Sequence, residues 1–257
     1  MKTLCIAISA ILMSTHAMAD DNSYIRNGNI YSNQGQYFVG AGVATGSKFF
    51  KDQDDQTGVY FNGGYHGEDF NADLGGINYR FFGNNDSAIN FSAYMVANPG
   101  FDTDSEDILK GMKERDFSGD LGLNADFHLG QGTLSAKFQH DITGAYDGYQ
   151  ADITYYHPMD LGFASLVPYA GAHYFSNEFV NYYTGVASFE ATSKRPAYQS
   201  NGALAFKVGY VLDIPITENL SLTQATAYTH LGSNMADSPI IDAKNQWLTT
   251  FGVNYSF

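Results

Sequence analysis

The chain has 257 residues and a formal net charge of −14, because 27 Asp and Glu outnumber 13 Lys and Arg. An acidic surface of this kind repels phosphate, so the charge argues against nucleic acid as a partner. The only cysteine, Cys5, falls within a predicted leader, so the exported chain would use neither disulfides nor cysteine chemistry.

The first residues have the features of a secretory signal peptide. An apolar run over 4–13 follows one lysine, and Ala17 and Ala19 form the small-x-small pattern of a signal peptidase site. The mature chain is therefore expected to begin at Asp20. The apolar run is about half of the roughly 20 residues that a membrane-spanning helix needs, and no later run approaches that length.

The rest of the chain, 20–257, has the composition and periodicity of a single β-barrel domain. All 27 Gly, 19 Tyr and 19 Phe lie in it. Glycine lets strands curve and close, and tyrosine suits a membrane interface at which one end of the ring is wet. Alternating apolar and polar residues predict eleven strands. In chain order they cover 36–45, 57–65, 69–81, 87–96, 117–128, 134–142, 148–157, 165–175, 202–213, 219–231 and 246–257.

The strand at 117–128 shows the alternation most clearly. Odd-numbered residues from Phe117 to Phe127 are apolar or small, whereas even-numbered residues from Ser118 to His128 are polar apart from one glycine. A strand with one side toward lipid and the other toward a lumen has this pattern. The pattern resumes after a tight Gly-Gln-Gly turn, which predicts a hairpin with the next strand.

Eleven strands conflict with the even number that single-chain outer-membrane barrels carry. The segment 23–31 is the most plausible additional strand. The predicted fold class is therefore all-β, an antiparallel transmembrane β-barrel of the outer-membrane type, with twelve strands preferred and ten as the alternative. In this topology 97–116, 143–147, 176–200 and 232–244 connect strands outside the cell, and the shorter turns face the periplasm.

The last strand indicates the environment. Its outward face carries aromatic residues at both ends, from Trp247 to Phe257, and these are separated by roughly 25 Å along the barrel axis, the height of the apolar band of an outer-membrane barrel. An edge strand of a soluble domain is the alternative interpretation. The ending also resembles the segment that barrel-assembly machinery recognises, through Thr250, Gly252, Tyr255 and Phe257.

Inward faces supply a polar wall. Eight residues are expected to line the lumen: Asp120, Asn124, Asp126, Lys137, Gln139, Asp141, Gln150 and Asp152. If the lumen is open it should favour cations, because Lys137 is the only base in this set. A filled, hydrogen-bonded interior with Lys137 in an ion pair is the alternative, because twelve strands lie between packed and open barrels.

Neither a metal site nor a catalytic site is predicted. The acidic stretches 51–55 and 101–107 lack the glycine and distal glutamate of a calcium loop, so they are interpreted as solvated loops. His140 and Asp141 are neighbours on a strand and therefore point to opposite faces. His128 and Asp126 are two positions apart, roughly 7 Å, which is too far for a hydrogen-bonded dyad.

Three groups of residues resemble motifs of the MipA/OmpV family of outer-membrane proteins, and they span most of the predicted mature chain. Thr184 departs from the family, which usually has an aromatic residue there. The motif residues are Leu109, Gly111, Met112 and Arg115, then Tyr182, Tyr183, Gly185, Val186, Glu190 and Ala191, and finally Ser238 and Pro239.

The resemblance implies a non-enzymatic protein, without cofactors, in the outer membrane of a Gram-negative bacterium. One branch of the family is similar to a scaffold that gathers a lytic transglycosylase and a penicillin-binding protein during murein growth. A role in envelope integrity, a small cation-preferring pore and a surface adhesin or antigen are the alternatives. Lipid, lipopolysaccharide and the barrel-assembly machinery are the other expected partners.

Overall fold

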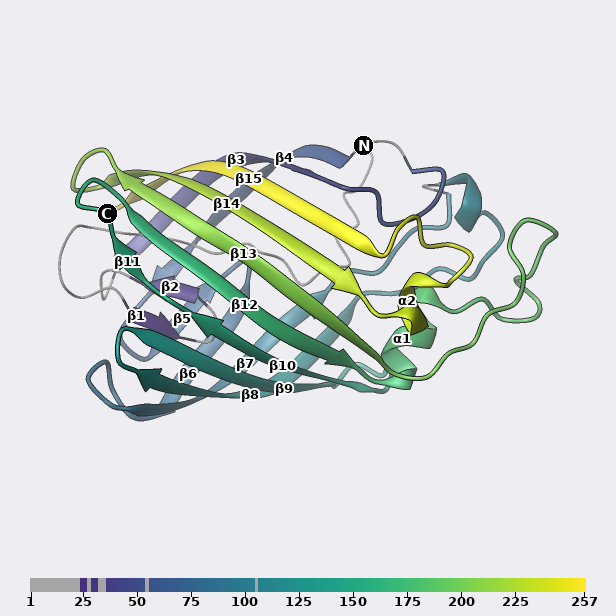
Figure 1. Cartoon of the computed structure of the whole chain (residues 1–257), viewed down its shortest axis with the longest axis horizontal. Coiled ribbons are helices and arrows are strands. Elements are labelled where there is room, and N and C mark those ends of the chain that lie inside the picture. Colours follow the sequence, from purple (N-terminus) through teal and green to yellow (C-terminus); the bar gives the residue numbers. More distant parts are fainter. Residues whose placement is uncertain (1–23, 27–28, 32–35, 54–55, 105) are drawn as a thin grey trace.

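The computed structural model describes the whole chain except residues 1–23, 27–28, 32–35, 54–55 and 105. The predicted signal cleavage at Ala17, Ala19 and Asp20 lies outside the described residues. The described part forms an antiparallel β-barrel with a few short helices gathered at one end (Figure 1). No helix in this part is long and apolar enough to cross a membrane.

Twelve strands form the barrel wall, as the sequence predicted, when β10 and β11 are counted as one strand interrupted near Pro158. Both pair with β12, and proline has no N–H to continue the ladder. The wall strands are β3 (Gln36–Gly46), β4 (Gln56–His66), β5 (Phe70–Asp73), β6 (Gly76–Phe82), β7 (Ile89–Asn98), β8 (Ser118–Leu129), β9 (Gly132–Asp141), β10 (Tyr149–Tyr156), β11 (Met159–Asp160), β12 (Ser165–Phe175), β13 (Ala203–Pro215), β14 (Leu220–Leu231) and β15 (Asn245–Ser256).

The sheet closes because the first and last wall strands pair. β15 and β3 are hydrogen-bonded from Leu248↔Gly46 to Ser256↔Phe38. A side chain at Gly42 would bring its Cβ to 2.3 Å from the Phe251 carbonyl oxygen, so glycine permits this close approach. The outward residues Trp247, Phe251 and Phe257 are exposed, as an apolar lipid-facing band requires.

One predicted strand is in fact two. The segment 69–81 forms β5 and β6, a short hairpin that pairs Asp73 with Gly76. The carboxylate of Asp73 accepts a hydrogen bond from the Gly75 N–H at 2.6 Å, and Gly76 has a φ of +121°, which disfavours other residues. The turn chemistry therefore overrides the alternating pattern and supplies the even strand number.

The segment 23–31, predicted as the twelfth wall strand, does not join the wall. Its described residues form β1 (Tyr24–Arg26) and β2 (Asn29–Tyr31), which pair only with each other. Ile25 is 2% exposed and packs with buried residues of β10, β12, β13 and β14. The small hairpin thus lies inside the barrel, near the end that holds Phe257 (Figure 1).

The barrel wall has a notch beside β4. The short β5 pairs with β4 only at Tyr65↔Ala72 and His66↔Asn71, and the β6–β7 ladder stops at Ile77↔Met95. Among the described pairings, residues 56–64 of β4 therefore have a partner only in β3. Val59 and Phe61 in this stretch are 73% and 74% exposed, more than any other large apolar wall residue in the described part.

The connections differ in size at the two ends of the barrel. The long segments between β7 and β8, β12 and β13, and β14 and β15 share the end that carries the helices. The opposite end has short turns and the C-terminus. Outer-membrane barrels have long loops outside and short turns in the periplasm, so the helix-bearing end is the outer end.

The notch predicts uneven backbone protection. Amides in 57–62 that do not bond to β3 should exchange hydrogen at least about 100-fold faster than amides of β14, which pairs on both sides. Hydrogen exchange with mass spectrometry on the barrel in lipid nanodiscs measures both stretches in one sample. Uniform protection along the whole of β4 would contradict a notch.

Candidate functional site: a folded cap over the outer mouth

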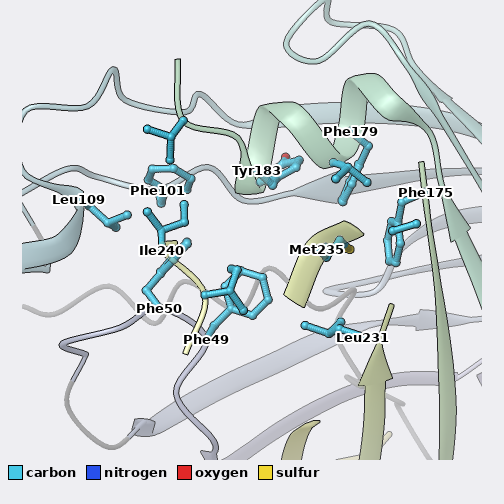
Figure 2. Packing of buried hydrophobic residues seen from close by; sticks show 14 of the residues in the cluster. Phe49, Phe50, Phe101, Leu109, Phe175, Phe179, Tyr183, Leu231, Met235 and Ile240 are labelled. Carbon is cyan, nitrogen blue, oxygen red and sulfur yellow. The ribbon is translucent and has the colours of Figure 1, made fainter. Parts of the chain in front are cut away.

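The outer connections fold together into a cap with its own hydrophobic core. The cap contains η1 (Asp107–Leu109), α1 (Asn177–Thr184) and α2 (Ser233–Ala236). Figure 2 shows its aromatic and aliphatic side chains converging from these helices and from the loops after β3 and β14. Leu109, Val180 and Ile240 are completely buried. A cluster of this size makes the cap a packed body, since each buried side chain of this kind stabilises by about 1.5–3 kcal/mol.

Helix α1 begins and ends where its sequence dictates. The Ser176 side chain caps it by accepting the Phe179 N–H, and the helix stops before Gly185. Phe179, Val180 and Tyr183 occupy one face, and this face is buried in the cap core. Tyr146, from the loop after β9, packs edge-on against Phe179 at 5.1 Å between ring centres.

An ion pair joins two distant family-motif segments. The Arg115 guanidinium donates to both carboxylate oxygens of Glu190, at 3.2 and 3.3 Å, and both side chains are almost fully buried. The same carboxylate accepts the Lys113 N–H at 2.8 Å and the Ala187 N–H at 2.9 Å. Arg115 also donates to the Tyr182 carbonyl at 2.7 Å. Every charge in the pair is therefore matched, as burial requires.

Two further contacts connect the motif groups. Arg195 donates to the backbone carbonyls of Glu190 and Ile108, so it links the loop after α1 to η1. Ser238 donates to the Thr184 carbonyl at 2.5 Å. Thr184, the departure from the family pattern, is buried, and its hydroxyl bonds to the Val180 carbonyl. Its side chain therefore faces the interior of the cap rather than an external partner.

The remaining motif residues also lie in the cap. Leu109 and Met112 are buried in its core, with Gly111 between them at a φ of +78°. Tyr183 and Val186 belong to the core, and Tyr182 packs against it. Pro239 is half-buried beside Ser238, and Ala191 is exposed. The structure thus brings together residues that lie up to 130 positions apart in the chain (109 to 239).

A pocket of about 700 Å³ opens on the surface of the cap. Its lining comes from residues 113–115, from Ala145, from the end of α1, and from 185–190 and 197–199. The paired residues Arg115 and Glu190 are both part of this lining. The sequence analysis named several of these residues as motif members but missed the pocket, because nothing in their spacing indicates that these segments meet.

The eight expected lumen residues are on inward faces, and seven of them are buried, with Lys137 half-buried. Asp120 is completely buried, and one of its oxygens accepts from Gln139, Gln150 and Tyr146 at 2.5–3.0 Å. Asp141 lies at the outer end, where it accepts the N–H groups of Tyr146 and Asp147 and so holds the loop after β9.

Further along the wall, bases missed by the sequence analysis balance the carboxylates. Asp152 pairs with Lys207 of β13 at 2.7 Å and lies 3.4 Å from His173 of β12. Asn124 accepts from Ser135 at 2.7 Å. Lys207 lies on the inward side of its strand, so alternation was the available signal for it. Asp120, Asp141 and Asp152 are thus each engaged by several groups, although other buried inward atoms, such as Asn124 Nδ2, have no hydrogen-bond partner among the described residues.

The two histidines considered as dyad candidates, His128 and His140, make their hydrogen bonds to groups other than carboxylates, whereas His66 bonds to Asp73 at 2.9 Å near the inner end of β4. His128 contacts Asn90 and Thr133, each at 2.9 Å, and His140 contacts the backbone carbonyl of Asp141. In the described part, no three His, Cys, Asp or Glu side chains are close enough to hold a metal ion.

Burial alone would raise the pKa of the Glu190 carboxyl. The hydrogen bonds from Arg115 and from the backbone N–H groups of Lys113 and Ala187 outweigh it, so the pKa lies below its ordinary value. Glu190 is therefore charged over the neutral range.

These features define the class of protein: an outer-membrane β-barrel whose outer mouth carries a folded cap. The model of the family described as MltA-interacting protein MipA matches residues 39–257. The chain belongs to this family, which confirms the resemblance seen in its motifs.

Its relatives carry the same assignment. The chain is 47% identical to outer membrane protein OmpV of Vibrio cholerae and 45% identical to outer membrane protein Omp26La of Vibrio anguillarum, and each match covers 100% of both chains. The protein is accordingly an outer-membrane protein.

Solved structures also resemble this chain at low sequence identity. The CymD monoaromatic hydrocarbon channel has a TM-score of 0.41 at 8% identity, over 88% of this chain and 89% of that chain. OmpT of Vibrio cholerae has a TM-score of 0.39 at 8% identity, over 88% and 99%.

Removing the charge of Glu190 should loosen the cap. Glu190→Gln leaves the Arg115 guanidinium buried without a counter-charge, and breaking such a pair costs about 3–5 kcal/mol. We expect protease to cut within 176–202 at least about 100-fold faster than in the wild type. Asp107→Asn is the matched control, because it breaks a fully exposed pair with Lys110 and should change nothing. Unchanged protection in Glu190→Gln would contradict the role given to this pair.

Acid should loosen the cap through the same group. The folded-state pKa of Glu190 lies below the unfolded value of about 4.3, so its stabilising effect is complete above that value and disappears as the pH falls through the folded pKa. Cap proteolysis with an acid-active protease should therefore accelerate below about pH 4 in the wild type. The Glu190→Gln variant should lack the part of this acceleration that Glu190 supplies, and an identical pH profile would argue against it.

Proposed function

We propose that the protein is a non-enzymatic, non-conducting scaffold of the outer membrane that holds murein-synthesis and murein-remodelling enzymes at its periplasmic end. The observation that carries this proposal is that folded parts of the chain lie at both ends of the barrel. The cap covers the outer mouth, and the hairpin bearing Ile25 occupies the inner end. Folded segments in these places hinder the passage of solutes, so such a barrel is better suited to presenting surfaces.

The lumen chemistry supports the same choice over a pore. The carboxylates of Asp120 and Asp152 are each engaged by several side chains, so they are not free to bind and release passing cations. The partners of His128 and His140 likewise favour a protein without catalysis at these residues. The family model is described as an MltA-interacting protein, and this supports a murein-active partner such as a lytic transglycosylase, with a penicillin-binding protein as a second.

The periplasmic turns offer the surface for such a partner. Phe163 is 68% exposed, Ile216 is 52% exposed and Leu161 is 41% exposed, and all three lie in inner turns. Exposed apolar side chains at a rim favour contact with another protein. The turns are short, so the interface is expected to bury less than the roughly 1,000 Å² that stable interfaces bury. The complex is therefore expected to be weak.

Affinity capture tests this proposal. The tagged barrel in mild detergent should retain a lytic transglycosylase or a penicillin-binding protein from envelope extracts, identified by mass spectrometry above an unrelated barrel of similar charge. Phe163→Ala should reduce the recovery at least about 5-fold, as loss of an interface aromatic does. Phe189→Ala, an equally drastic change in the outer cap, should leave it unchanged. Recovery of neither enzyme class would sink the scaffold.

A second candidate is recognition of a molecule at the cell surface, as a surface adhesin or antigen would need. The pocket on the outer face of the cap favours it specifically. The two functions use opposite ends of the barrel and do not exclude each other.

A further inference from the structure

We propose that the pocket on the cap binds a neutral oligosaccharide. The pocket lies outside the barrel, on the side that faces the cell exterior, and nothing in the scaffold function uses it. Its volume of about 700 Å³ is within the range of small-molecule sites, about 300–1,000 Å³. The proposal depends on its rigidity, on the side chains that it leaves without partners, and on its balance of charge.

The pocket walls are held in place before any ligand arrives. Val186 and Tyr198 exchange two backbone hydrogen bonds of 2.9 Å, which join the two sides of the loop. The Asn181 side chain both accepts from and donates to the backbone of Ser200, at 2.9 and 2.7 Å. The Glu190 carboxylate fixes Ala187 from below. A preformed site of this kind avoids the entropy cost of ordering loops upon binding.

Phe189 is a large apolar side chain that the fold leaves exposed. It is 81% exposed, the highest value of any large apolar side chain in the described part. It lies in the connection after α1, beyond the strand ends, so contact with membrane lipid does not account for its exposure. Tyr182 and Tyr198 are half-buried in the same lining. The pocket therefore offers aromatic rings to the apolar face of a ligand.

The rim of the pocket supplies polar side chains that are available to a ligand. The side chains of Lys113, Glu114, Ser188 and Gln199 line the pocket and make no hydrogen bond or ion pair with the described residues. Together they include donors and acceptors. A ligand rich in hydroxyl groups can use both kinds at once.

The charge of the lining selects a neutral ligand. Lys113 lies next to Glu114, and Arg115 is paired with Glu190, so the positive and negative side chains of the lining balance. The chain as a whole has a net charge of −14, which repels sulfated or phosphorylated glycans. Sugars combine apolar ring faces with neutral hydroxyl groups, and this matches aromatic walls with a polar rim. An extended peptide fits less well, because the Val186–Tyr198 bridge already uses the nearby backbone groups.

Saturation-transfer NMR on the full barrel in nanodiscs tests the proposal. The probes are maltotriose, chitotriose, mannotriose and galactotriose at up to about 10 mM, with a sulfated trisaccharide for comparison. We expect saturation transfer to at least one neutral sugar and a weaker signal from the sulfated one. The absence of transfer to every neutral probe, or preference for the sulfated sugar, would overturn the proposal.

Two variants locate the binding. Phe189→Ala should weaken the affinity of the best sugar about 5- to 10-fold, because an aromatic stacking contact is lost. Phe163→Ala, an exposed phenylalanine at the opposite end, should leave sugar affinity at the wild-type value. Equal affinity in Phe189→Ala and the wild type would remove the ligand from this pocket. The same two variants have the reverse effects on enzyme capture, so failure of one proposal is distinguishable from failure of the other.

A further measurement distinguishes a sugar of the cell's own envelope from a sugar that comes from outside the cell. Saccharide that copurifies with protein extracted from native membranes, and is absent from Phe189→Ala, places the ligand in the cell's own envelope. Protein that is free of saccharide but binds the added neutral probe takes its ligand from outside the cell. Both results support a neutral-oligosaccharide site.

Discussion

Hydrocarbon offers no hydrogen-bond partners, and most of this structure follows from that constraint. Wall strands must pair along their edges, so the sheet closes through β3 and β15, and side chains alternate between lipid and lumen. The inward face then collects carboxylates, amides and bases in a narrow space, where they pair with one another. The contacts of Asp120 with Gln139 and Gln150, and of Asp152 with Lys207, are the result.

The cap depends on polar contacts that hold the outer loops together. Its segments come from loops that are far apart in the chain, and loops alone seldom form a packed core. Arg115 and Glu190 align two of these segments, and Arg195 adds η1, so that apolar side chains such as Leu109 can be buried above the barrel. The outer and inner ends thereby become separate working surfaces. One is a rigid body with a pocket, and the other is a ring of short turns.

The alternating pattern of 117–142 was enough to predict β8 and β9, because the polarity of each residue depends only on whether its side chain faces the lipid or the lumen. It failed at 69–81, where the alternation of residue types continues but the backbone turns at the local Asp-Leu-Gly-Gly sequence. It also failed at 23–31, because the place of a hairpin inside the barrel depends on the partners of Ile25. The cap motifs were recognisable in the sequence, but the ion pair of Arg115 with Glu190 arises from tertiary packing.

The notch beside β4 makes the barrel unequal around its circumference. The backbone groups of 56–64 that face the notch have no ladder partner in the described part, so they need water, which the polar lumen supplies most readily. One flank of the protein therefore has backbone groups without a ladder partner in the described part, whereas β13 and β14 pair continuously along their length. Viewed from above, the molecule has a front and a back. A neighbouring molecule in the membrane therefore meets a different surface on the notched flank than on the β13–β14 flank.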